Sequence, residues 1–99
     1  MLRITTHEDS AAVTLVLEGK CRGAWVEELE HCWRRTHASA AGRKLRVDLE
    51  KVGFVDKRGK ELLAEMYAAG VEFSATGLMM RSMLDGIAAS CLQAAKQRA

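Results

Sequence analysis

Short stretches of the chain alternate apolar and polar residues, which is typical of half-buried β-strands. The clearest alternation is in 44–49, whereas 13–18 is β-branched and apolar and is followed by Gly19. The predicted strands are 2–5, 13–18, 44–49 and 71–75, with a brief extended piece over 53–55. Only a short turn separates the first two strands, so we expect them to pair antiparallel.

Three other stretches show the spacing of amphipathic helices. The first covers 22–40, where Val26, Leu29, Trp33 and His37 share one face with Cys32 alongside. Trp25 lies about 80° from Trp33 around that helix, so one tryptophan is expected at the edge of the core.

The second helix is expected to begin after Asp56, which is a good N-cap, and to end at Gly70. The third begins at Leu78 and carries Lys96 and Arg98 near its end, where cations favour the helix dipole. Each helix has one apolar face. These faces are Gly59, Leu62, Leu63, Met66 and Tyr67 in the second helix, and Met80, Met83, Leu84, Ile87, Cys91, Leu92 and Ala95 in the third.

The order β-β-α-β-α-β-α predicts an α/β fold with a mixed, mostly parallel sheet covered by helices. The 99 residues are enough for one domain, which we place over 1–99. A composition of 48% hydrophobic and 28% charged residues is typical of a globular chain, and the absence of proline favours uninterrupted helices.

Charge and cysteine content narrow the function classes. Fifteen basic and thirteen acidic residues give a net charge of +2, which is too even to indicate nucleic acid. The chain has no apolar run long enough to span a membrane and no signal-like start, so we expect a cytoplasmic protein. Cys21, Cys32 and Cys91 are widely spaced and predict reduced thiols, with no metal site and no cofactor.

One stretch, 45–63, is similar to a known motif. It has Asp48 and Leu49 at a strand end, then Phe54, Val55 and Asp56, and Gly59 inside the following helix. This pattern resembles the core motif of STAS domains, the domains of anti-sigma-factor antagonists and of sulfate-transporter tails. The resemblance extends over roughly 10–87, since Gly19 and Gly77 also follow strands at matching places.

The resemblance implies a non-enzymatic module that binds a regulatory protein, either an anti-sigma factor or a related kinase-like ATPase. The family also includes a small subunit of a lipid-trafficking ABC transporter, so a transporter ATPase is the alternative partner. Active antagonists carry a phosphorylatable serine where this chain has Arg58. We therefore expect no phosphorylation switch at this position, and the nearest later hydroxyls are Ser74, Thr76 and Ser82.

The candidate partner-binding residues are Asp56, Lys57, Arg58 and Lys60. Asp56 is expected to hold the loop, and Gly59 to allow the helix close approach to a neighbour. Each cation in the first turn opposes the helix dipole, at a cost of ~0.3–1 kcal/mol when exposed. A local rule broken without structural gain indicates a functional position.

Two other classes remain open. An enzyme or nucleotide binder would depend on Asp48 and Asp56 as a carboxylate pair, although no phosphate-binding glycine loop is present. A nucleic-acid surface would use Lys51 with the three bases above, but no aromatic residue is interleaved with them.

Three methionines lie within five residues: Met79, Met80 and Met83. One helical stripe cannot bury all three, and methionine adapts to irregular partners. We expect these residues to lie partly at a contact surface. The oligomeric state is left open by the sequence.

Overall fold

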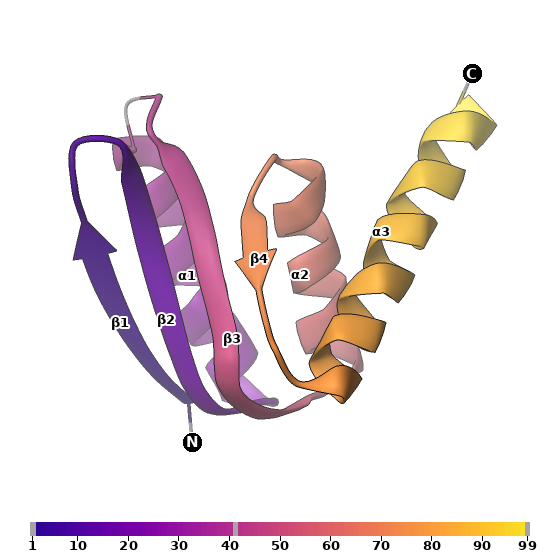
Figure 1. Ribbon diagram of the computed structural model, residues 1–99, viewed down its shortest axis with the longest axis horizontal. Coiled ribbons are helices and arrows are strands. Elements are labelled where there is room, and N and C mark those ends of the chain that lie inside the picture. Colours follow the sequence, from indigo (N-terminus) through magenta and orange to yellow (C-terminus); the bar gives the residue numbers. More distant parts are fainter. Residues whose placement is uncertain (1, 41, 99) are drawn as a thin grey trace.

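The computed structural model describes residues 2–40 and 42–98, with side chains described as far as Cys91. Its elements follow the predicted order β-β-α-β-α-β-α (Figure 1). They are β1 (Leu2–Glu8), β2 (Ala12–Cys21), α1 (Ala24–Ser39), β3 (Lys44–Val55), α2 (Lys57–Ala68), β4 (Glu72–Ser74) and α3 (Leu78–Arg98).

The strands form one sheet in the order β1-β2-β3-β4. β1 pairs antiparallel with β2, whereas β2 with β3 and β3 with β4 are parallel. The chain is therefore an α/β protein with a mixed, mostly parallel sheet, as predicted. The parallel pairs direct the ends of β2 and β3 to one edge, where Cys21 and Val55 are register partners.

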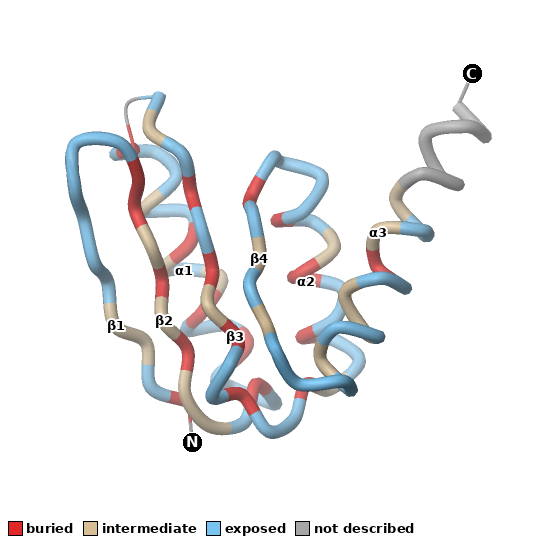
Figure 2. Tube along the Cα trace, viewed as in Figure 1, coloured by how far each residue is buried: buried red, intermediate tan, exposed pale blue. Residues whose placement is uncertain are grey.

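The core lies between one face of the sheet and the helices. Leu15 and Leu17 of β2 and Val47 and Leu49 of β3 are fully buried, because alternate residues of a strand point to the same face. Helices α1 and α2 lie behind this face in Figure 1, and Figure 2 shows buried positions along β2 and β3. The helices contribute Val26, Leu29 and Trp33 from α1 and Leu62, Leu63 and Met66 from α2.

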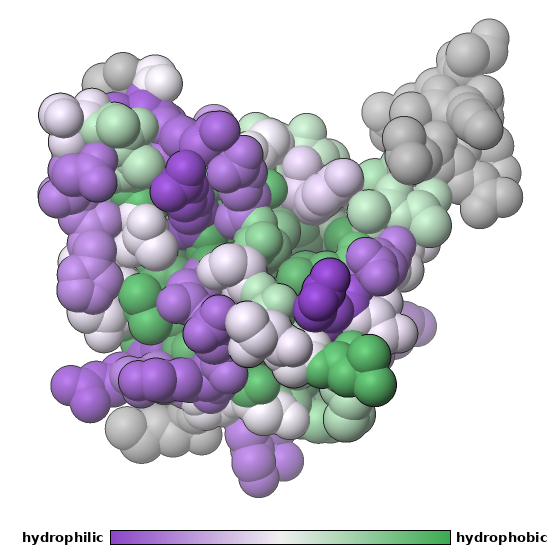
Figure 3. Space-filling model, in the orientation of Figure 1, coloured by the Kyte–Doolittle hydropathy of each residue, from purple (hydrophilic) through white to green (hydrophobic). Residues whose placement is uncertain are grey.

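The helices cover only this face of the sheet. The prediction of a sheet covered by helices therefore holds for one face. The opposite face carries half-buried or exposed residues such as Thr14 and Asp48. Glu72 of β4 bridges Lys44 at 2.9 Å and Arg46 at 3.4 Å across this face. Hydrophilic residues dominate it in Figure 3.

Helix α3 lies beyond β4 and packs against α2 (Figure 1). Ile87 is buried, and the other predicted contact residues of its described part are half-buried against the core: Met80, Met83, Leu84 and Cys91. The predictions for the side chains of Leu92, Ala95, Lys96 and Arg98 lie outside the described residues.

Several boundaries differ from the predicted ones. The segments 44–49 and 53–55 belong to the single strand β3, which exceeds its partner β2 by two residues. The register shifts twice, between Val16 and Glu18 and between Gly19 and Lys20. Such bulges change which residues face the core.

Two residues assigned to apolar helix faces are exposed instead, His37 of α1 and Tyr67 of α2. Each lies four residues after a buried position, Trp33 or Leu63, and so about 40° further around its helix, at the edge of the buried face. The two tryptophans behave as expected, because Trp33 is 4% exposed and Trp25 is 39% exposed.

Candidate functional site

Asp56 joins three segments at the carboxyl edge of the sheet. One carboxylate oxygen, Oδ1, accepts the Gly59 N–H at 2.7 Å, which is the predicted N-cap of α2. The other, Oδ2, accepts the Gly23 N–H at 3.0 Å, just before α1. The Asp56 N–H donates to the Cys21 carbonyl at 3.0 Å, at the end of β2.

These contacts fix the loop electrostatically as well as geometrically. The N–H groups of Gly23 and Gly59, with smaller contributions from Arg58 and Arg22, hold the pKa of Asp56 below its ordinary value of 3.8. The side chain is therefore a carboxylate at neutral pH. The β3–α2 connection is held in one conformation, with Asp56 fastening it as expected.

Gly59 lies where α2 approaches the ends of β2 and β3. A Cβ at this position would lie 2.8 Å from Val55 Cγ1 and 3.0 Å from the Cys21 carbonyl oxygen. The predicted close approach is confirmed, since only glycine fits without movement of a neighbour.

The basic residues at the start of α2 point to two different sides. All three are exposed. Arg58 pairs with Glu27 of α1, with Nη2 at 3.6 Å from Oε1. Lys57 and Lys60 instead line a groove between α2 and α3, and neither forms an ion pair within the described side chains. The sequence-based set is thus divided into one residue toward α1 and two toward α3.

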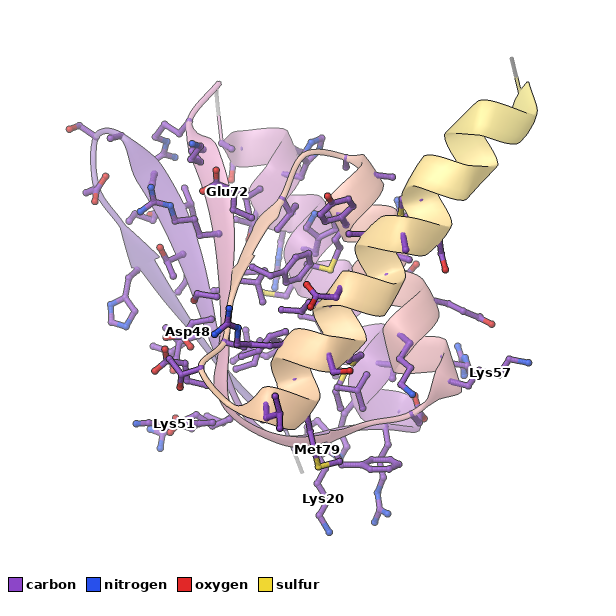
Figure 4. All side chains as sticks on the ribbon, turned by 45° about the vertical axis from the view of Figure 1, so that its right-hand side comes forward. Lys20, Asp48, Lys51, Lys57, Glu72 and Met79 are labelled. Atoms are coloured by element: carbon purple, nitrogen blue, oxygen red, sulfur yellow. The ribbon has the colours of Figure 1, made fainter. Side chains whose placement is uncertain are left out.

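Large apolar side chains are exposed near the same edge. Leu78 and Met79 at the start of α3 are 85% and 83% exposed, and Phe54 at the end of β3 is 47% exposed. Phe54 is the register partner of Lys20, and Figure 4 shows Met79 and Lys20 at the same end of the molecule. Figure 3 shows an apolar patch over the start of α3, at the lower right.

The methionine prediction divides in the same way. Met79 is almost fully exposed, whereas Met80 and Met83 are half-buried against the core. The three do not all fill the core, and their role in contact stays a prediction. The exposure of Phe54 was missed, because the second register shift leaves Gly53 as an extra residue and changes the phase of β3.

Asp48 does not join this site. Its side chain accepts the Glu50 N–H at 2.9 Å, and its register partners are Val16 and Ser74. Asp48 and Val55 are seven positions apart along β3, which is roughly 23 Å at the usual rise. Asp48 and Asp56 therefore do not form the carboxylate pair on which the enzyme hypothesis depends.

Lys51 also lies apart from the other bases. It pairs with Glu18 at 3.5 Å, and Figure 4 shows Lys51 and Lys57 on opposite sides of the view. The four-residue basic surface considered for nucleic acid is not formed.

The three cysteines are free thiols. Burial, and then the nearby charge of Asp56, raise the pKa of the Cys21 thiol to about 11. Over the described side chains, no group of histidine, cysteine and carboxylate residues has the arrangement of a metal site. In the same part of the chain, none of the helices has the length and hydropathy needed to cross a membrane.

No protein-family model matches the chain, and a comparison with curated proteins finds no similar one.

Proposed function

We propose that the chain is a non-enzymatic, STAS-like interaction module that binds a regulatory protein at the start of α2. The observation that carries this proposal is the Asp56 bridge. It fixes a loop whose exposed neighbours are cationic at Lys57 and Lys60 and apolar at Leu78 and Met79. Exposed apolar residues beside uncompensated charge are typical of a binding surface.

The charges at the start of α2 are unfavourable for the stability of the helix, which supports a role for them in binding. Helix α2 has no acidic residue in its first turn, and its N-terminus carries partial positive charge. Arg58 is partly compensated by Glu27, but Lys57 and Lys60 have no such partner among the described side chains. An acidic partner would supply the missing charge and raise the rate of association.

The resemblance suggests the partner class. Within it, an anti-sigma factor or kinase-like regulator in the cytoplasm is our first choice, and a transporter ATPase is the alternative. The position of Arg58 in place of the switch serine implies constitutive rather than phosphate-controlled binding.

The test uses the immobilised chain and the cytoplasmic proteins of the organism that encodes it. The double variant Lys57→Glu/Lys60→Glu should lose the partner while keeping its fold, because acidic residues at a helix N-terminus are favourable. The matched control is Lys51→Glu, which changes one charge on the open face.

A protein retained by wild type and control but not by the double variant is then purified, and its association rate is measured at low and high salt. Its identity separates the regulator from the transporter ATPase. Equal retention by all three baits, or an association rate that salt does not change, would overturn the proposal.

A further inference from the structure

A long groove separates α2 from α3 beside the Asp56 loop. It is an open hollow of about 580 Å³. Ala64, Met83 and Ile87 are among the apolar residues that line it, and Lys57, Lys60 and Glu61 line its α2 side. Figure 4 shows Lys57 at the start of α2 and Met79 at the start of α3, which are the two helices that form its walls.

The α3 wall consists of two rows of side chains spaced four residues apart. One row is Ser82, Gly86 and Ser90, and the other is Met83 and Ile87. Rows with this spacing form the ridges and grooves by which helices pack together. Extended back by one step, the two rows reach Leu78 and Met79, the two most exposed large apolar residues of the described chain.

The groove therefore continues into an open apolar surface. From Leu78 to Ser90, the first row spans about 18 Å at 1.5 Å per residue. Small residues in this row allow a second backbone to approach closely. A ligand confined to the groove would leave Leu78 and Met79 in water, whereas a helix of about twelve residues would cover both.

The charges define the chemistry of this helix. Lys57, Lys60 and Glu61 are exposed on the α2 wall, so one net positive charge remains there, and the α2 dipole adds positive potential at the same end. A second copy of α3 would not neutralise them, because its described exposed face carries Arg81 and Asp85 in equal number.

We infer that this groove receives an acidic amphipathic helix of the partner protein, with apolar residues against Met83 and Ile87 and carboxylates against Lys57 and Lys60. The inference rests on the proposed function and names the partner element that the same edge recognises. Met79 and Leu78 extend the apolar contact beyond the groove.

The experiment begins with a displayed library of 18-residue helical peptides whose exposed positions are randomised. The wild-type chain is the bait. We expect enriched peptides with apolar residues at i, i+3, i+4 and i+7 and acidic residues on the flanks. A synthetic copy of the most enriched peptide should shift the methyl NMR signals of Met79 and Met83 and leave that of the buried Met66 unchanged.

Two variants locate the binding. Gly86→Gln places a long side chain in the groove, and we expect a loss of at least tenfold in affinity. Its control is Ala89→Gln, an exposed position of the same helix outside the groove, with unchanged affinity expected. Lys57→Glu/Lys60→Glu should also reduce the affinity at least tenfold.

Three results would overturn the inference. The first is the enrichment of peptides without acidic flanks. The second is that dodecanoate, but not the peptide, saturates the shifts of the Met79 and Met83 methyl signals. The third is that the chain sediments as a dimer that Gly86→Gln dissociates. A cellular partner lost on charge reversal but retained by Gly86→Gln would remove the groove and leave the proposed function standing.

Discussion

Replacing Gly59 with alanine tests the packing that positions the site. The backbone of Gly59 is helical, so alanine itself is compatible with it. The new Cβ would, however, lie 2.8 Å from Val55 Cγ1, 3.0 Å from the Cys21 carbonyl oxygen and 3.2 Å from Asp56 Oδ1. The carbonyl cannot move freely, because it accepts the Asp56 N–H at 3.0 Å.

Two opposing effects determine the magnitude. Overpacking by one methyl group costs ~1–3 kcal/mol, because side chains or backbone must shift. Alanine gains up to ~1 kcal/mol over glycine in helix propensity. We therefore expect Gly59→Ala to lower the free energy of unfolding by about 1 kcal/mol. For a chain of this length, that corresponds to a fall in Tm of roughly 4–8 °C.

The assay is urea unfolding followed by circular dichroism. Gly86→Ala is the matched control, because Gly86 is also inside a helix but a Cβ there meets nothing within 4 Å. It should raise stability by roughly 0.5–1 kcal/mol. If Gly59→Ala stabilises the chain as Gly86→Ala does, α2 is not in close contact with β2 and β3, and the reasoning fails.

Three further predictions follow from the same edge. Asp56→Asn should be less stable than wild type at neutral pH. Because the folded pKa of Asp56 lies below 3.8, the carboxylate contributes to the free energy of unfolding above about pH 4, and this contribution is lost as the pH falls through the folded pKa. The stabilities of the variant and the wild type should therefore converge in acid. A difference in stability that stays constant with pH would contradict the Asp56 bridge. Cys21 should be the slowest thiol of the native chain to react with a disulfide reagent, because a pKa of about 11 leaves roughly one thiolate in a thousand at pH 8. If Cys21 reacted as fast as Cys91, the end of β2 would be open to the reagent. In peroxide footprinting, Met79 should oxidise before the buried Met66, and a bound partner should slow the oxidation of Met79 but not that of Met66. Equal oxidation rates in the free chain would contradict the exposed start of α3.

The local rules of the chain were sufficient for much of this site. The cap of Asp56 depends on Gly59, three positions further along the sequence. The close approach of Gly59 involves the neighbouring Val55 but also the Cys21 carbonyl of β2, which the sequence does not identify. The order of strands and helices, the antiparallel first pair and the parallel remainder also follow from periodicity. These features are determined by short-range chemistry, and they are the ones that the sequence predicts well.

The exposure of Phe54 depends on long-range structure. The alternation of β3 is interrupted because two of its residues have no counterpart in β2, and no residue type marks where the extra ones occur. Val52 and Val55 are both buried although they are three residues apart. A bulge is set by the pairing of two strands, so one strand's pattern does not reveal it.

The sequence already indicates that Arg58 lies on a different side of α2 from Lys57 and Lys60. Lys57, Lys60 and Ala64 share a stripe at helical spacing, whereas Arg58 lies about 100° further around the helix. The side that each stripe faces could not be predicted, since it depends on where α1 and α3 pack. The structure resolves this by placing Glu27 beside Arg58 and the groove beside the two lysines.

Helix α2 therefore separates two surfaces of opposite character. Toward α1, ion pairs join the helices, with Arg34 bridging Glu30 and Glu65 and Arg58 meeting Glu27. Toward α3, the groove leaves apolar residues open, and its two lysines outnumber the one carboxylate, Glu61, that lines it. Charge that is already neutralised within the chain has little to offer a partner, whereas uncompensated charge steers association at a rate that salt screens. The salt-dependent part of partner binding should accordingly come from Lys57 and Lys60, and Arg58 should contribute mainly to the contact between α1 and α2.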